Sequence, residues 1–224
     1  MRVSIIQPNY IPWRGYFDFF KQSDVFVFYN DVMYTKNDWR NRNTIKTPDG
    51  LQWLTIPVND NKRVSKGLLI NGATTLGSDW KERHLSSLEL NYKNAPFIGE
   101  VLDIMEEGFM GDSYDLSEIC ISITQKILDY LGINCKTVRS SEIGYSNLSK
   151  TDRVVQICKE LKATEYLSGD AAKDYMEMEK FGEIRVLWHR YKEKVYPQLW
   201  GDFISKVSIV DLLANCGTKA YDII

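Results

Sequence analysis

The sequence predicts an α/β fold: a mostly parallel β-sheet with helices on both faces and a small antiparallel meander inserted. Three observations predict it. Short apolar runs alternate with segments whose apolar residues recur at helical spacing. The first thirty residues have the pattern strand, helix, strand, which is the βαβ unit of a parallel sheet. Residues 44–71 instead carry the turn signature of a hairpin.

Length and composition limit the class of protein. We expect the 224 residues to form a single α/β domain, and the 44% apolar and 26% charged residues are typical of a soluble globular protein. A net charge of −2 argues against nucleic-acid binding, which needs a basic face. No run approaches the roughly 20 apolar residues of a membrane span, and residues 1–8 lack the features of a signal peptide. We therefore expect a cytoplasmic protein.

The cysteines and histidines suggest no metal site. The four cysteines form no C-x-x-C pair, and we expect them to be small reduced core residues: Cys120, Cys135, Cys158 and Cys216. The two histidines, His84 and His189, are far apart in sequence. We expect neither a metal nor a cofactor.

The opening stretch has the character of a ligand-binding loop. A predicted strand at 2–6 is followed by a loop that Pro8 and Pro12 keep extended, and then by a predicted helix at 16–21. Ligands of α/β proteins bind at such strand-to-helix loops. The polar and aromatic residues that we expect to contact substrate are Gln7, Asn9, Tyr10, Trp13, Arg14 and Gly15. The alternative, that aromatic residues here are core, weighs most for Phe17, Phe19 and Phe20.

A second candidate loop follows the predicted strand at 24–29. Residues 30–43 are dense in amides, charges and aromatic rings, a composition that suits a ligand-facing loop better than a core element. We expect this loop to face the opening loop across one pocket, with Trp39, Asn41 and Arg42 turned inward. Asp31 is a candidate base. The alternative is a solvated surface loop.

The middle of the chain combines a meander with a helical segment. We expect a hairpin from 44–47 and 51–58 around Pro48-Asp49-Gly50, a mobile polar segment at 59–66, and a third strand at 67–71. Between residues 78 and 131 the periodicity predicts helices at 79–92, 96–107 and 116–130, with Gly132 as a C-cap. His84 lies on the apolar face of the first, where a core histidine is the alternative to a base.

The last ninety residues return to the α/β pattern. We expect strands at 135–140, 164–167 and 184–188, with helices at 154–161 and 207–214. Between the second strand and a further expected helix, Ser168-Gly169 makes a turn whose backbone N–H groups, with Lys173, could hold a phosphate. Such a turn is also common in any strand-to-helix loop. Residues 196–201 form a stiff aromatic segment.

Several stretches together resemble the WbqC-like protein family. They are the opening loop, 31–43, 53–58, 166–169 and 196–201, in the same order over essentially the whole chain. The resemblance implies a role in bacterial surface-polysaccharide (O-antigen, lipopolysaccharide) biosynthesis. Some members of the family are described as glycine or other acyl-group transferases, which implies decoration of a nucleotide-linked amino sugar. Many relatives carry histidine before the glutamine of the opening motif, where this chain has Ile6.

A more distant resemblance is to nucleotidyltransferases that carry His-x-Gly-His after the first strand. Trp13-Arg14-Gly15-Tyr16 has the same register, but both histidines are absent. This resemblance implies a Rossmann-like architecture and a nucleotide pocket, not the reaction. Arg14 could pair with a phosphate, and the alternative is a solvated surface charge.

Two functions follow as hypotheses. The first is a transferase that adds an acyl group, glycyl or another aminoacyl group included, to the amine of a nucleotide-linked amino sugar, for example a dTDP-linked one. Asp31 and His84 are candidate bases, and Asn9, Asn41 and Arg42 are candidate oxyanion donors. Because no nucleophile elbow, Cys-His signature or Walker loop is present, the acyl donor would arrive already activated.

The second hypothesis is a non-catalytic nucleotide-sugar or polysaccharide-binding protein of the same pathway. A scaffold partner of a glycosyltransferase is a third, and it would need an exposed apolar patch. We expect no nucleic-acid partner. The sequence leaves a homodimer open.

Overall fold

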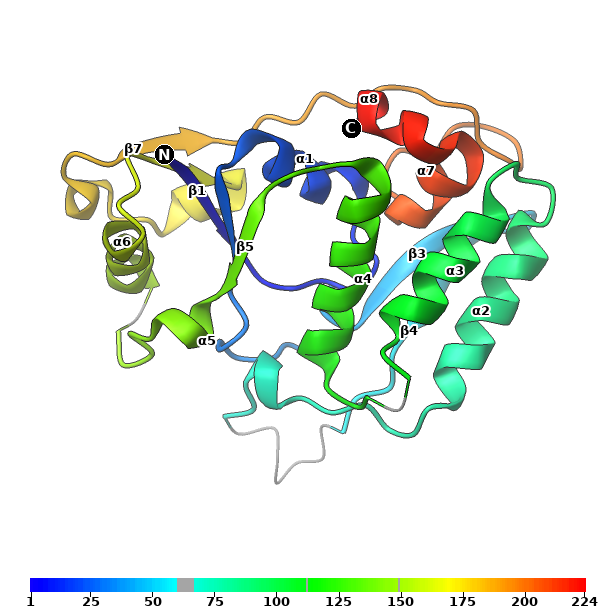
Figure 1. The fold of residues 1–224 in the computed structure, drawn as a ribbon, viewed down its shortest axis with the longest axis horizontal. Helices are drawn as coiled ribbons and strands as arrows, with labels where there is room; N and C mark the ends of the chain where they lie inside the picture. The colour runs from blue at the N-terminus through cyan, green and yellow to red at the C-terminus, as the bar shows by residue number, and fades with distance from the viewer. Residues whose placement is uncertain (60–66, 112, 149) are drawn as a thin grey trace. The chain divides into compact units, whose positions relative to one another are not determined.

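The computed structural model describes residues 1–59, 67–111, 113–148 and 150–224. The chain forms two compact units, each built from separate stretches of sequence (Figure 1). Unit 1 contains Met1–Gln7, Gly15–Asp31 and Asn134–Lys192, and unit 2 contains Pro8–Arg14, Val32–Ile133 and Glu193–Ile224. These units are defined by contacts within the chain and not by a demonstration that each folds alone. The expectation of one domain over the whole chain therefore stays a prediction.

A five-stranded parallel sheet forms the centre of unit 1, which confirms the predicted fold class. Its order is β5-β2-β1-β6-β7. The strands are β1 (Arg2–Ile6), β2 (Val25–Phe28), β5 (Lys136–Arg139), β6 (Glu165–Ser168) and β7 (Arg185–Trp188). β1 pairs with β2 on one side and β6 on the other, so the strand order reverses there. Open α/β sheets bind ligands beside such a switch point.

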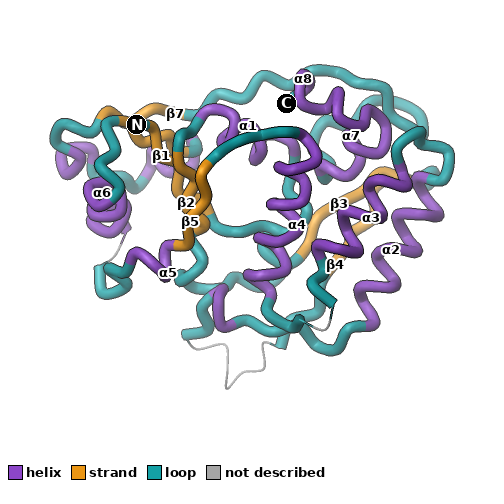
Figure 2. Tube along the Cα trace, viewed as in Figure 1, coloured by secondary structure: helices purple, strands orange, loops and turns teal. Residues whose placement is uncertain are grey.

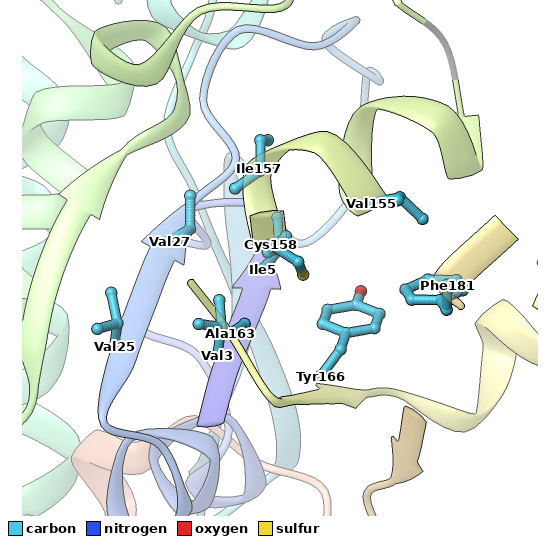
Figure 3. Packing of buried hydrophobic residues seen from close by; sticks show 10 residues of the cluster. All are labelled: Val3, Ile5, Val25, Val27, Val155, Ile157, Cys158, Ala163, Tyr166 and Phe181. Atoms are coloured by element: carbon cyan, nitrogen blue, oxygen red, sulfur yellow. The ribbon is translucent and has the colours of Figure 1, made fainter. Parts of the chain in front are cut away.

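Helices cover both faces of this sheet because successive strand residues point to opposite sides. On one face, the Phe20 ring of α1 (Arg14–Gln22) stacks on Phe26 of β2, with ring centroids 3.8 Å apart. On the other, α6 (Lys150–Glu160) buries its apolar side chains in a cluster with β1 and β2 (Figure 3). Phe17, Phe19 and Phe20 are all buried, so the core alternative is right for these three. The short elements of unit 1 are α5 (Ser140–Ile143) and the 3-10 turns η2 (Asp170–Asp174) and η3 (Met178–Phe181).

Unit 2 contains the predicted hairpin, made of β3 (Arg42–Thr47) and β4 (Gly50–Thr55) (Figure 2). Gly50 has φ 109, a conformation that favours glycine. The expected third strand is wrong. Leu69 makes an isolated bridge to Met33, and the chain then turns into the 3-10 element η1 (Ile70–Gly72), which buries the Ile70 side chain. The segment expected to be mobile lies outside the described residues from 60 to 66.

The helices of unit 2 match the predicted periodicity closely. They are α2 (Asp79–Tyr92), α3 (Ile98–Gly108), α4 (Leu116–Leu131), α7 (Ile209–Cys216) and α8 (Ala220–Ile223), with the 3-10 turn η4 (Gly217–Lys219). Gly132 is the left-handed C-cap of α4, as predicted. At Gly108 a Cβ would lie 2.7 Å from Cγ1 of Ile123, so glycine allows α3 to pack closely against α4. Among the described residues, no helix is both long and apolar enough to cross a membrane.

Candidate functional site

The opening loop of unit 2 is held in one shape by two other segments. The side-chain amide of Asn43, in β3, donates to the Ile11 carbonyl over 2.9 Å. The backbone N–H of Ile209, at the start of α7, donates to the Pro12 carbonyl over 2.9 Å. Ile11 has φ 34, which is unfavourable for a β-branched residue and persists only where surrounding structure fixes it. The loop is therefore a pre-formed feature.

A pocket of about 330 Å³ lies against this loop. Its lining residues are Asn9, Pro12, Trp13, Trp39, Asn43 and Lys206. The backbone N–H of Tyr10 donates to the Trp39 carbonyl over 2.9 Å, which ties the opening loop to the 31–43 stretch. The pocket thus brings together three of the predicted residues, Asn9, Trp13 and Trp39.

The chemistry of this pocket suits a polar ring. Two indoles offer flat apolar surfaces, the Asn9 amide offers polar atoms, and Lys206 adds an exposed positive charge, while the Asn43 amide is already bonded to the backbone. Within the described ranges, Oδ1 of Asn9 has no hydrogen-bond partner. An aromatic cavity with a few convergent polar groups is the usual form of a small-molecule site.

Tyr10 and His84 are placed in the interior of unit 2. Tyr10 is fully buried, and its hydroxyl lies 2.7 Å from Nδ1 of His84. Burial lowers the pKa of His84 to about 4, against a hydrogen bond to the Thr55 backbone that raises it. The ring is therefore neutral near pH 7, and its Nδ1 accepts a hydrogen bond from the Tyr10 hydroxyl. Neither residue is among those that line the pocket, and the role of His84 as a base stays a prediction.

Arg14 is also buried, with 2% of its surface exposed. Its guanidinium carbon lies 5.1 Å from the centre of the Tyr196 ring and 5.6 Å from that of Phe203, and the side chain donates to the Lys194 carbonyl. Arg14 is not a solvated surface charge. Its role toward a phosphate stays a prediction.

Asn41 and Arg42 are not among the residues that line the first pocket. The Asn41 amide donates to the Ile56 carbonyl over 2.9 Å, and Asn41 lines a separate pocket of about 250 Å³. The Arg42 guanidinium carbon lies 4.2 Å from the centre of the Trp53 ring. Of the three side chains expected to turn into the shared pocket, Trp39 alone lines it.

Asp31, Gln7 and Gly15 belong to unit 1. The Asp31 carboxylate follows β2 and accepts hydrogen bonds from the Arg153 guanidinium and the Ser140 hydroxyl. The ion pair is buried, with side-chain exposures of 3% for Arg153 and 8% for Asp31. Gln7 follows β1 and is partly buried, and Gly15 is buried in the first turn of α1.

The Ser168-Gly169 turn also lies in unit 1. The element after it is the 3-10 turn η2 and not the expected helix, because Ala172 and Tyr175 already bond three residues back. The Lys173 ammonium is paired with Asp170 over 2.6 Å and lies 5.2 Å from the Trp188 ring. Across the described ranges, no three of the His, Cys, Asp and Glu side chains gather as a metal site.

The profile of the WbqC-like protein family matches residues 7–223. The chain belongs to this family. It is also 41% identical over 225 residues to the uncharacterized protein Rv1507c of Mycobacterium tuberculosis (strain ATCC 25618 / H37Rv), covering 99% of this chain and 96% of the relative. No solved structure matches the chain. The resemblance seen in the sequence is thereby confirmed at the level of the family.

One segment that carries the WbqC-like resemblance, 196–201, is tied to α7 by a buried carboxylate. Asp211 is fully buried and accepts from the hydroxyls of Tyr92 and Tyr196 over 2.9 and 2.8 Å, and from the Gln198 amide over 2.8 Å. Burial raises the pKa of Asp211, and these donors oppose the rise. The network fixes the segment that leads to Lys206 in the pocket wall.

Asn43 and Lys206 line the pocket of unit 2 but were not among the residues predicted from the sequence. Asn43 had a signal, because it is a polar residue on the strand face that also carries the buried Ile45. Asp211 had a similar one, as a lone carboxylate in the apolar stretch 207–214. Lys206 had none, since a single lysine between predicted elements looks like any surface residue.

Proposed function

We propose that this WbqC-like protein is a cytoplasmic transferase that adds an acyl group, glycyl or another aminoacyl group included, to the amine of a nucleotide-linked amino sugar in surface-polysaccharide biosynthesis. The observation that supports the proposal is the pocket of unit 2, with Trp13 and Trp39 among its walls and Asn9, Asn43 and Lys206 as its polar groups. Family membership supports the pathway.

The pocket composition matches the parts of such a substrate. The C–H face of a sugar ring packs on indole, and its hydroxyls pair with amides. Oδ1 of Asn9, which has no partner in the described part of the chain, is an acceptor for a hydroxyl or an amine N–H. The Lys206 ammonium offers a counter-charge to the phosphates that link sugar and nucleoside.

The reaction exchanges one bond at the acyl carbon and moves one proton from the amine. The sugar nitrogen attacks the acyl carbon, the bond from that carbon to its leaving group breaks, and the amine gives one proton to a base. Asp31 and His84 stay the candidate bases that the sequence suggests, although neither is among the residues that line the pocket; the low pKa of His84 leaves its ring unprotonated near pH 7. The acyl group enters already activated, and the leaving group departs with the bonding electron pair.

A second candidate function is a nucleotide-sugar or polysaccharide-binding protein without turnover. One observation favours it: the described residues that line the pocket include no carboxylate and no histidine, the side chains that most often act as a base. Binding alone would need no base at this place.

Turnover by the purified protein separates the two functions. The protein would be mixed with a dTDP-linked 4-amino sugar and an activated glycyl or acetyl donor, and the sugar product would be analysed by mass spectrometry. We expect an acylated product, its loss in Trp39→Ala, and normal turnover in Tyr175→Ala, whose exposed ring lies in unit 1. Binding of the nucleotide sugar without product from any donor would favour the binding protein, and neither binding nor product would contradict both functions.

A further inference from the structure

The aromatic wall of the pocket continues onto the surface of unit 2. Trp39 lines the pocket and is also 49% exposed. Its ring centroid lies 5.9 Å from that of Trp53, which is 45% exposed, and the two rings are inclined by 32°. A pair of large exposed indoles beside a cavity is an unusual way to leave apolar surface in water. We call Trp39, Trp53 and Arg42 the aromatic shelf.

Arg42 places a positive charge on this shelf. Arg42 pairs with Thr55 across the hairpin, so Trp53 is its diagonal neighbour on the same face. The Arg42 guanidinium lies on the Trp53 ring, and in the described ranges its Nε–H has no acceptor and no carboxylate pairs with the side chain. Nearby Arg40 differs, because it is paired with Asp38 over 2.6 Å.

The pocket itself is small for a whole nucleotide sugar. Its volume of about 330 Å³ is near the lower limit of ligand pockets, which run from roughly 300 to 1,000 Å³. A sugar ring fits this space, and a nucleoside diphosphate attached to it needs further surface. The aromatic shelf adjoins the pocket, since Trp39 belongs to both.

We propose that the aromatic shelf is the nucleotide subsite: the base stacks on the exposed indole surface and a phosphate pairs with Arg42, while the sugar occupies the pocket. This inference rests on the proposed function. A guanidinium group suits a phosphate because it presents paired donors. Any nucleotide base can stack on an aromatic side chain, because every base has a π-face. Arg42 takes this role rather than Arg14, whose charge is enclosed by Tyr196 and Phe203.

The test uses two ligands, dTDP and thymidine, and two matched pairs of variants, with affinities from isothermal titration calorimetry. Arg42→Gln removes the charge and is expected to weaken dTDP about tenfold while thymidine is unchanged, and Arg40→Gln is its control. Trp53→Ala is expected to weaken both ligands about tenfold. Leu51→Ala, on the same face of β4 and 51% exposed, is the control for it and should change neither.

The outcomes for the shelf and for the reaction are separable. Unchanged dTDP affinity in Arg42→Gln and Trp53→Ala, or no dTDP binding by the wild type, overturns the shelf whether or not acyl transfer occurs. The expected losses in both variants support the shelf even if the wild type turns over no donor, in which case the transferase alone fails. Equal weakening in Arg40→Gln would show a general charge effect and overturn the role of Arg42.

Discussion

The charged groups of unit 1 and those around the pocket of unit 2 differ in what neutralises them. At the carboxyl ends of the unit 1 strands, Asp31 is paired with Arg153 and Lys173 is paired with Asp170. Around the unit 2 pocket, Lys206 is exposed and Arg42 lies on an indole without a carboxylate in the described ranges. Removing one partner of a buried pair leaves the other charge uncompensated, whereas a charge without a partner is available to a ligand. The comparison therefore predicts stability effects in unit 1 and affinity effects in unit 2.

The largest expected effect is the loss of the buried ion pair in unit 1. Asp31→Asn leaves the Arg153 charge buried without its partner and is expected to lower the free energy of unfolding by about 3–5 kcal/mol. Urea unfolding measures this. The exposed pair offers a control, because Asp170→Asn should leave the midpoint of urea unfolding almost unchanged. A fully stable Asp31→Asn protein that has lost turnover would contradict a purely structural role for this ion pair and would favour Asp31 as the catalytic base.

The next effect is a loss of stability in acid that involves His84. Its folded pKa of about 4 lies below the ordinary value of 6.5, so folding favours the neutral ring. The contribution of the neutral His84 ring to the free energy of unfolding is complete above about pH 6.5. It is lost as the pH falls toward 4, and the loss is about 3 kcal/mol. We expect urea unfolding at pH 7.5 and 4.5 to show this loss in the wild type and a smaller one in His84→Phe. Equal losses in the two proteins would contradict a buried neutral histidine.

The two arginines Arg14 and Arg42 provide a third test of the comparison, within unit 2. Arg14→Met removes a buried guanidinium that lies near two aromatic rings and is expected to cost about 2 kcal/mol of stability. Its dTDP affinity, measured by calorimetry below the unfolding transition, should match the wild type. Weakened dTDP binding by a stable Arg14→Met protein would return the phosphate role to Arg14.

The fold was largely predictable because it depends on local patterns. In the strands of unit 1 and the helix at 116–131, the apolar residues follow the spacing that buries them in the structure. Gly132 ends that helix because glycine readily adopts the left-handed conformation found there. The third strand at 67–71 failed because a short apolar run looks the same whether it pairs or turns.

The site was less predictable because long-range contacts decide it. Arg14 is enclosed by rings at 196 and 203, and a sequence of this length gives no sign of that contact. Asn9, Trp13 and Trp39 could be selected from the composition of their loops, since binding residues are often on loops, but the same composition also selected Tyr10 and Arg14, which are buried. Lys206 lines the same pocket although it lies far along the chain from the other lining residues.

The smallest expected effect concerns Lys206. An exposed ammonium interacts with a phosphate through solvent, and such pairs contribute about 0.5–1 kcal/mol, which is a twofold to fivefold change in affinity. Lys206→Met should therefore weaken dTDP by that factor at low salt, and the difference from the wild type should shrink as salt is added, because exposed charges are screened. Lys93→Met, an exposed lysine at the end of α2, is the matched control and should bind as the wild type does. If both variants lose affinity equally, the net charge of the protein and not the pocket attracts the ligand, and Lys206 then belongs with the solvated surface rather than with the site.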